Sequence, residues 1–298
     1  MKNDTARPVV FGEVLFDHFA DGSVVLGGAP FNVAWHLQAF GQAPLFISQV
    51  GDDPLGRQVR ESMLAWHMDT AGLGLDSAHP TGVVNVTIAD GEPHYDICTD
   101  RAYDFIDPES LPPMPNDGIL YHGTLALRSD VSRLALEQLK QTCVVKAFVD
   151  INLRAPWWDR SAVQQVMSDA SWIKLNEDEL VEIVPDEPDT ERRIDCLLSQ
   201  LSVEQLVVTR GEAGALCVSP DGERLVVTPD SVTTVVDVVG AGDAFSSVML
   251  LGQIQGWPLS LTLERAQEFA SAIVGIRGAT IKDIGFYQPF ITAWGLAA

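Results

Sequence analysis

The sequence predicts one α/β domain of 298 residues, in which a largely parallel sheet is covered by helices on both faces. Two observations lead to this fold class. Short apolar runs, typical of strands buried on both faces, alternate with helical segments over most of the chain. One stretch breaks this rhythm with alternating apolar and polar side chains, which predicts a second, smaller sheet.

The N-terminal elements follow from apolar runs and their punctuation. Pro30 suits the first turn of a helix, and Gly41 suits its end. The expected elements are a strand at residues 9–14, a helix at 30–40, a strand at 45–50 and a helix at 55–67.

The rest of the chain continues the same alternation. In the helix expected at residues 130–141, Val131, Leu134, Ala135 and Leu139 lie on one side of the helix, which predicts the buried face. The other expected elements are strands at 119–122, 146–150, 172–175 and 205–209, and a helix at 244–251.

Residues 82–89 alternate apolar and polar side chains, and a turn at 90–91 joins them to a second strand at 94–98. A hairpin with one apolar face must cover another part of the protein. We therefore expect a small lid sheet over the ends of the main strands, with its strands within about residues 14–26 and 82–104. The alternative is an ordinary edge hairpin of the main sheet.

The composition excludes several classes of function. With 41 acidic and 19 basic side chains the formal net charge is −22, which disfavours nucleic-acid and membrane-surface partners. The four cysteines show no zinc-ligand spacing. The first residues, MKNDTARPVVFGEVLFD, lack the continuous apolar core typical of a signal peptide, and no apolar run has the length of a membrane helix. We expect a cytoplasmic protein.

Several familiar site motifs are absent from the sequence. It contains no G-x-x-x-x-G-K-[ST] phosphate loop, no G-x-S-x-G elbow and no H-E-x-x-H helix. The first strand is not followed by G-x-G-x-x-G, which argues against a nicotinamide-dependent oxidoreductase.

The strongest local signal is DVVGAGDAF at residues 237–245, which follows a β-branched run and precedes the 244–251 helix. Gly240, Ala241 and Gly242 would let backbone amides approach a phosphoryl group at a helix N-terminus. Asp243 would accept a hydroxyl proton there. The alternative is that Asp243 only stabilises the helix N-terminus.

Other polar residues follow predicted strand ends. Asp17, Gly27, Gly28 and Asn32 could hold a small polyhydroxylated ligand, or could be ordinary turn residues. Further along the chain, the same kind of position is occupied by Arg154, Lys174, Asn176, Glu179, Thr209, Gly211 and Gly214. A helix cap explains Asn176 and Glu179 equally well. The carboxyl ends of parallel strands share one edge of a sheet, so we expect these residues to converge.

With these motifs the chain resembles the ribokinase-like carbohydrate kinases of the phosphofructokinase B type. DVVGAGDAF is similar to the family signature D-T-x-G-A-G-D-x-F, with Val238 in place of the usual threonine. LGGAPFNVAWHLQAFG, VGDDPLG, DINLRAPWW and KLNEDEL resemble segments of bacterial fructokinases. The resemblance implies a three-layer αβα sandwich with a mostly parallel central sheet and a β-sheet lid.

The resemblance also implies roles for individual residues. Asp243 would be the general base, with an anion hole from Gly240, Ala241, Gly242 and Asp243. Sugar hydroxyls would be held by Asp17, Gly27, Gly28 and Asn32, with Arg154 as a further phosphate or sugar partner. The nucleotide would contact Lys174, Asn176, Thr209, Gly211, Gly214 and Gly242. Glu179 would organise Mg²⁺ through water, and Asp237, Val239 and the stretch 277–278 would bind a monovalent cation such as K⁺.

These inferences predict an ATP- and Mg²⁺-dependent sugar kinase, with D-fructose as the first candidate acceptor. The alternatives are ribose, 2-keto-3-deoxygluconate or a nucleoside such as adenosine, and a non-catalytic sugar- or nucleotide-binding regulator on the same fold. The intact Asp243 and its glycine turn argue against the regulator. The apolar lid face leaves a homodimer open.

Overall fold

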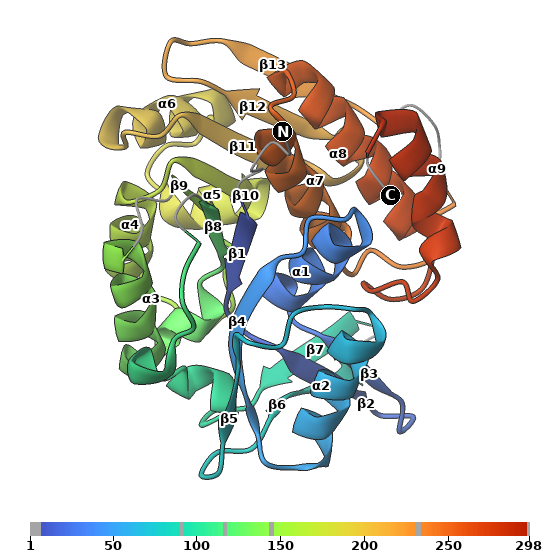
Figure 1. Cartoon of the computed structure of the whole chain (residues 1–298). Helices are drawn as coiled ribbons and strands as arrows, with labels where there is room; N and C mark the ends of the chain where they lie inside the picture. Colours follow the sequence, from blue (N-terminus) through green and yellow to red (C-terminus); the bar gives the residue numbers. More distant parts are fainter. Residues whose placement is uncertain (1–6, 90–91, 116–117, 143–145, 230–233, 297–298) are drawn as a thin grey trace.

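The computed structural model describes residues 7–89, 92–115, 118–142, 146–229 and 234–296. Its centre is a nine-stranded sheet with the strand order β13-β12-β11-β10-β9-β8-β1-β4-β5 (Figure 1). Neighbouring strands pair in parallel, except that β12 is antiparallel to both β11 and β13. The strands are β1 (Arg7–Phe11), β4 (Leu45–Gly51), β5 (Leu73–Asp76), β8 (Gly118–His122), β9 (Lys146–Asp150), β10 (Trp172–Asn176), β11 (Gln205–Thr209), β12 (Ala215–Val218) and β13 (Arg224–Val227).

Helices cover both faces of this sheet, as the apolar runs predict, and the three layers confirm the expected sandwich (Figure 1). One face packs against α1 (Ala29–Ala39), α2 (Pro54–Ala65), α7 (Ala241–Gln255), α8 (Leu259–Val274) and α9 (Ile284–Trp294). The other packs against α3 (Asp130–Thr142), α4 (Arg160–Ser168), α5 (Glu177–Ile183) and α6 (Thr190–Gln200). α1 is buried along nearly its whole length, and α7 is buried from Ala244 to Gly252, whereas its first turn at residues 241–243 reaches the surface.

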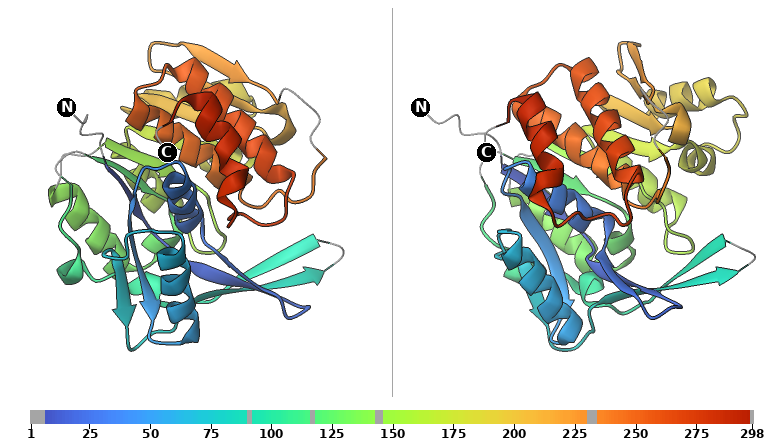
Figure 2. Two further views of the ribbon diagram at one scale, coloured as in Figure 1. Left: turned by 45° about the vertical axis from the view of Figure 1, so that its right-hand side comes forward. Right: turned by 90° about the vertical axis from the view of Figure 1, so that its right-hand side faces the viewer.

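The predicted lid is a separate four-stranded sheet in the order β3-β2-β6-β7. It consists of β2 (Leu15–Phe19), β3 (Val24–Gly27), β6 (Gly82–Ala89) and β7 (Glu92–Ile97), and it projects from the main body in both views of Figure 2. Val84, Val86 and Ile97 are buried on its inner face, which confirms the alternating pattern. The turn predicted at residues 90–91 lies outside the described residues.

Two local predictions are wrong. The first strand ends at Phe11 and not at residue 14, because Gly12 adopts a φ of +145° and the chain turns there into β2. In α3, Leu134 is 63% exposed, and Ser132 and Leu136 are buried instead. The Ser132 hydroxyl turns this side inward by accepting a hydrogen bond from the Ile106 amide (3.0 Å).

The DVVGAGDAF segment also differs from its prediction, because no strand precedes α7 within the described residues 234–239. The amides of Val236 and Asp237 donate to the Val274 carbonyl at the end of α8, at 2.9 and 3.2 Å. Val236 and Asp237 are therefore held by a helix terminus and not by a neighbouring strand.

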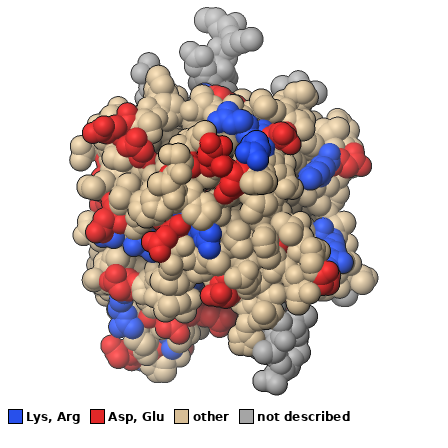
Figure 3. Space-filling view, turned by 90° about the horizontal axis from the view of Figure 1, so that it is seen from below, with Lys and Arg blue, Asp and Glu red and all other residues tan. Residues whose placement is uncertain are grey.

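The surface agrees with the composition. On the face shown in Figure 3, basic side chains lie beside acidic ones and form no extended basic patch of the kind that binds nucleic acids. In the part of the chain that the structure describes, no helix combines the length and hydrophobicity needed to span a bilayer.

The contact between α7 and α8 gives a stability prediction. A Cβ atom at Gly252 would lie 2.3 Å from the Thr262 Cγ2 atom, so Gly252→Ala forces the two helices apart. We expect a loss of about 1–3 kcal/mol in the free energy of unfolding and a melting temperature lower by several degrees, measured by calorimetry. Gly285→Ala, where the new methyl group meets only the flexible Asp283 side chain, is the control. Equal melting of Gly252→Ala and wild type would contradict this packing argument.

Candidate active site

The first turn of α7 is fixed by its glycine N-cap. Gly240 adopts the left-handed conformation (φ +82°), and a Cβ atom there would lie 2.4 Å from the Ala279 Cβ, so only glycine fits. Helix geometry leaves the amides of the first turn without intrahelical acceptors. The Ala241 amide donates a long bond to the Val238 carbonyl (3.3 Å), so Gly242 and Asp243 supply the stronger candidates for an anion hole.

The Asp243 carboxylate lies in this turn and accepts a hydrogen bond from the Asn32 amide group (2.7 Å). Asn32 is itself buried on α1, so two predicted site residues far apart in the sequence meet here. Burial raises the pKa of Asp243 to about 6, and the neighbouring Asp150 acts in the same direction. The Asn32 hydrogen bond and the charges of Lys174 and Arg154 lower this pKa. A carboxylate with this pKa is suited to accept a proton near neutral pH.

The turn between the lid and α1 brings the other predicted sugar ligands together. Gly28 is the N-cap of α1 with a φ of +107°, and a Cβ atom there would lie 2.7 Å from the Glu13 carbonyl oxygen. Asp17 lies within lid strand β2, and not directly after the first strand as predicted, and its Oδ2 atom lies 3.6 Å from the position of a Gly27 Cβ. Burial raises the pKa of Asp17 to about 6.

Arg154 connects these carboxyl groups electrostatically. It lies exposed after β9, and its positive charge lowers the pKa values of Glu13, Asp17 and Asp243. The guanidinium therefore faces the predicted base and the predicted sugar ligand together, as expected for a residue that contacts an anionic or polyhydroxylated ligand.

Lys174 lies below the α7 turn. Its Nζ atom forms an ion pair with the buried Asp150 carboxylate at 2.7 and 2.9 Å, and it lies 3.5 Å from the position of a Cβ atom at Gly242. The predicted nucleotide contact of Lys174 thus has a place at the anion hole, although the resting partner of this lysine is Asp150.

Asn176 and Glu179 form the capping box of α5. The Asn176 Oδ1 atom accepts from the Glu179 amide, and the Glu179 Oε2 atom accepts from the Asn176 amide, both at 2.8 Å. The Glu179 Oε1 atom accepts from the Leu153 amide (2.8 Å), and burial raises the pKa of this glutamate. With both oxygens engaged, Glu179 fits a magnesium ion through bound water better than as a direct ligand.

The turn after β11 holds the remaining predicted nucleotide contacts. Thr209 pairs with Asn176 across β10 and β11, so these two residues share one edge of the sheet. Gly211 adopts a φ of +53° with open space around it. Gly214 adopts a φ of +85°, and a Cβ atom there would lie 1.9 Å from the Val227 carbonyl oxygen, so packing against β13 alone requires glycine.

The predicted cation residues lie in two loops that Asp237 joins. The two carboxylate oxygens of Asp237 accept from the amides of Val239 and Gly278, each at 3.0 Å. This arrangement joins 237–239 to 277–278, and both Asp237 oxygens are engaged by backbone amides. The structure, over the ranges it describes, holds no group of three or more His, Cys, Asp or Glu side chains placed to bind a metal.

Glu13 and Tyr95 lie near the predicted site residues but were not predicted from the sequence. Glu13 is 3% exposed, its Oε2 atom has no hydrogen-bond partner among the described residues, and burial raises its pKa to about 7. A carboxylate within the apolar run VVFGEVLF was a signal that could have been found. Tyr95 of β7 shares the inner face of the lid with Asp17, and no sequence signal distinguishes it from other hairpin residues.

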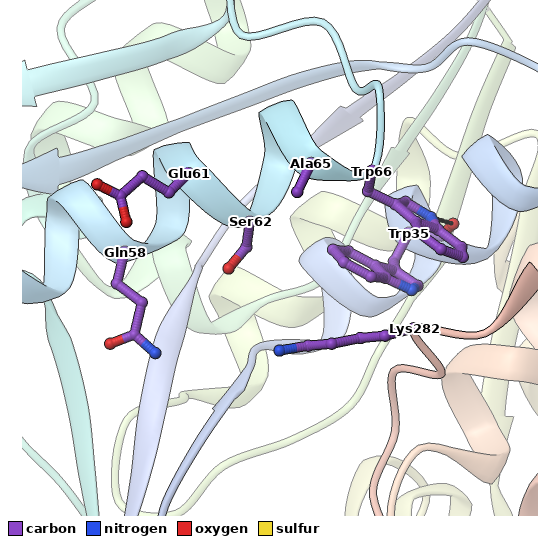
Figure 4. Close-up of a pocket in the computed structure, with 7 residues that line it drawn as sticks. All are labelled: Trp35, Gln58, Glu61, Ser62, Ala65, Trp66 and Lys282. Atoms are coloured by element: carbon purple, nitrogen blue, oxygen red, sulfur yellow. Dashed lines mark hydrogen bonds between the residues drawn. The ribbon is translucent and has the colours of Figure 1, made fainter.

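A cavity of about 300 Å³ lies apart from these residues, between α1, α2 and the segment before α9 (Figure 4). The stacked indole rings of Trp35 and Trp66 lie at one end, above the Lys282 side chain. Both indole N–H groups donate to backbone carbonyls, at 2.9 and 3.1 Å, and no predicted site residue lines the cavity. Its polar groups therefore give no indication of a ligand.

Comparisons with known proteins find carbohydrate kinases among the sequences similar to this chain. The model of the pfkB family carbohydrate kinases matches residues 7–284. A fructokinase from Klebsiella pneumoniae is 32% identical over 258 residues, covering 82% of this chain and 83% of the relative. An aminoimidazole riboside kinase from Salmonella typhimurium is 28% identical over 250 residues, covering 80% of this chain and 77% of the relative.

The fold of the chain is also similar to that of solved kinase structures. A double mutant of the fructokinase from Vibrio cholerae O395, solved with fructose, ADP and a potassium ion, superposes with a TM-score of 0.82 at 24% identity. The match covers 97% of this chain and 99% of that structure. This likeness confirms the ribokinase-like fold.

The hydrogen bond from Asn32 gives a prediction for the pKa of Asp243. Because this bond stabilises the carboxylate, Asn32→Leu should raise the pKa of Asp243 above its value of about 6. Carboxyl ¹³C NMR across a pH series measures the change, with the Asp243 signal assigned by its loss in Asp243→Asn. Asn85→Ala, on the outer face of the lid, is the control. A lower or unchanged pKa in Asn32→Leu would contradict the assigned role of Asn32.

Proposed function

Because the chain belongs to the pfkB family of carbohydrate kinases, we propose that it transfers the γ-phosphoryl group of ATP to a primary hydroxyl group of D-fructose. The observation that carries the proposal is the Asp243 carboxylate at the glycine-rich N-terminus of α7, with Asn32 bound to it. The 32% identity to a fructokinase supports fructose as the acceptor.

In the proposed reaction the oxygen of the sugar hydroxyl group attacks the γ-phosphorus atom, and Asp243 takes the proton of that hydroxyl group. The bond between this phosphorus and the β–γ bridging oxygen breaks, and ADP leaves with the electron pair. Negative charge on the transferring group lies against the amides of Gly242 and Asp243 and the positive end of α7. Asp17, Gly27, Gly28 and Asn32 orient the sugar, and Arg154 lies beside it.

The nucleotide side of the site supports ATP as the donor. Lys174, Asn176, Thr209, Gly211 and Gly214 lie on β10, β11 and the loops that follow them, and we assign them to ATP. We assign Mg²⁺ to Glu179 through water and K⁺ to the loop of Asp237 and Val239. Mg²⁺ would neutralise phosphate charge, and K⁺ would stiffen the loop before α7. The proposal places this chemistry in the cytoplasm, where ATP is available.

A ribonucleoside is the second candidate acceptor, because an aminoimidazole riboside kinase is 28% identical over 80% of the chain. An ADP-release assay with ATP and Mg²⁺, with and without K⁺, distinguishes the candidates on a panel of fructose, ribose, 2-keto-3-deoxygluconate, adenosine and aminoimidazole riboside. The highest kcat/KM on fructose supports the proposal. Turnover on a nucleoside alone overturns it in favour of the second candidate, and no turnover on any acceptor favours a regulator. A homodimer formed through the lids stays a prediction.

Replacing the proposed base tests the mechanism. Asp243→Asn keeps the shape of the side chain and removes its proton acceptor, so kcat should fall by at least about 100-fold with KM values within a few-fold. Steady-state kinetics on the acceptor identified by the panel measures both constants. Near-normal turnover in this variant would remove Asp243 from the base role.

The pH dependence follows from the raised pKa values. Asp243 and Asp17 each have a pKa of about 6, and the proposed base must be deprotonated to act. We expect kcat/KM to be constant above neutral pH and to fall as the pH drops through about 6, measured with ATP saturating. A constant kcat/KM down to pH 5 would contradict the assignment.

Tyr95 gives a test of the lid. It is 50% exposed and shares the inner lid face with Asp17. Burial and the Asp17 and Asp237 carboxylates raise the pKa of Tyr95, and Arg154 lowers it. Tyr95→Ala should raise the KM for the sugar several-fold and leave the KM for ATP unchanged, because the ring adds contact area on the sugar side only. His94→Ala, on the opposite face of β7, is the matched control. Equal sugar KM values for the two variants would remove Tyr95 from the sugar site.

A further inference from the structure

We propose that Asp150 is a positioning residue for the phosphoryl transfer, holding the first turns of α7 and the Lys174 ammonium group in one fixed arrangement beneath the anion hole. The inference rests on the proposed function, because it assigns Asp150 a part in that reaction. Neither the glycine motif nor the proposed base includes this residue.

Asp150 is the point at which four elements of the fold meet. Its carboxylate, 2% exposed at the end of β9, accepts from Lys174 of β10, from the Ser246 hydroxyl group of α7 at 2.7 Å and from the Tyr121 hydroxyl group of β8 at 3.2 Å. A buried carboxylate that accepts hydrogen bonds from this many donors is held in one orientation.

Ser246 is the link to the helix. Its hydroxyl oxygen lies 2.7 Å from the Asp150 Oδ2 atom and 3.0 Å from the Gly242 carbonyl oxygen, one turn earlier in α7. The hydroxyl group carries one hydrogen atom, and the carboxylate is the stronger acceptor. Asp150 therefore anchors α7 within one turn of Gly242 and Asp243, the residues whose amides and carboxylate perform the proposed reaction.

Lys174 is the second group that Asp150 holds. A Cβ atom at Gly242 would lie 3.5 Å from Nζ, so the ammonium group lies beside the first turn of α7. Without Asp150 this buried positive charge would have no carboxylate in its present position, and it would move toward Asp243 or toward water. The ion pair thus sets how much positive charge lies behind the anion hole.

The ion pair of Asp150 and Lys174 also shifts the pKa of Asp243, the proposed base. The groups that face Asp243 are Asn32 of α1, Asp150, Lys174, the Arg154 guanidinium and the Glu13 carboxyl group. Among them Asp150 raises the pKa of Asp243 and Lys174 lowers it. Removing the negative charge at Asp150 should therefore lower the pKa of the base, an effect that a loss of packing alone does not produce.

The test compares two adjacent serines of α7, both fully buried. The Ser246 hydroxyl group reaches Asp150, whereas the Ser247 hydroxyl group donates only to the Ala244 carbonyl of its own helix (2.7 Å). Ser246→Ala should lower kcat about 10-fold with the sugar KM within about twofold, since it frees the catalytic turn without touching the substrate. Ser247→Ala should keep wild-type kinetics.

Asp150→Asn supplies the second readout. We expect kcat to fall by at least about 10-fold and the acidic limb of the kcat/KM profile to move to lower pH. If this variant does not fold, Asp150→Asn combined with Lys174→Met removes both charges of the pair. Because Asp150 raises the pKa of Asp243 more than Lys174 lowers it, a smaller shift of the acidic limb in the same direction is expected.

The outcomes separate the two proposals. A wild-type protein that phosphorylates no sugar overturns the proposed function. An active wild type in which Ser246→Ala and Ser247→Ala have equal kcat values, or in which the loss of Asp150 leaves the acidic limb in place, overturns the positioning role alone. A lower kcat for Ser246→Ala together with a shifted acidic limb supports it.

Discussion

Burial of a carboxylate at the N-terminus of a central helix is the constraint on which the rest of this structure depends. Asp243 is half-buried, which raises its pKa toward the range that the proposed base role needs, and removing a charge from water costs free energy. The first turn of α7, the Asn32 amide group and the nearby cations reduce that cost. α7 must therefore lie inside the molecule, with α1 beside it and a sheet wide enough to bury both.

The parallel sheet meets this requirement because its strands end on one side. Asp150 closes β9, Lys174 lies near the end of β10, and both reach α7 from below. The Tyr121 hydroxyl group reaches Asp150 from β8. Groups on adjacent strands are held to within a fraction of an ångström by the hydrogen-bonded ladder, a precision that exposed loops rarely give.

Most of the architecture could be predicted from the sequence, because buried parallel strands appear as apolar runs and the lid appears as alternation. The signature residues Asn32 and Asp243 could be predicted to meet, because each follows a glycine turn at a helix start. The contact of Val236 and Asp237 with the end of α8 could not be predicted, since β-branched residues fit a strand and a helix-terminus contact equally well. Asp150 has a clear role only once Ser246 and Lys174 are seen to converge on it.

The acidity of the chain makes the arrangement of its few buried cations important. With a net charge of −22, the protein as a whole repels a nucleoside triphosphate, so attraction must be local and short-ranged. In the proposal the exposed Arg154 supplies it on the sugar side, and the buried Lys174 supplies it beneath the α7 turn, where low polarisability strengthens the lysine charge. A free lysine in this place would bind phosphate but would also pair with the base. Asp150 prevents that pairing, so the positive charge remains behind the transferring group while Asp243 stays free to take a proton.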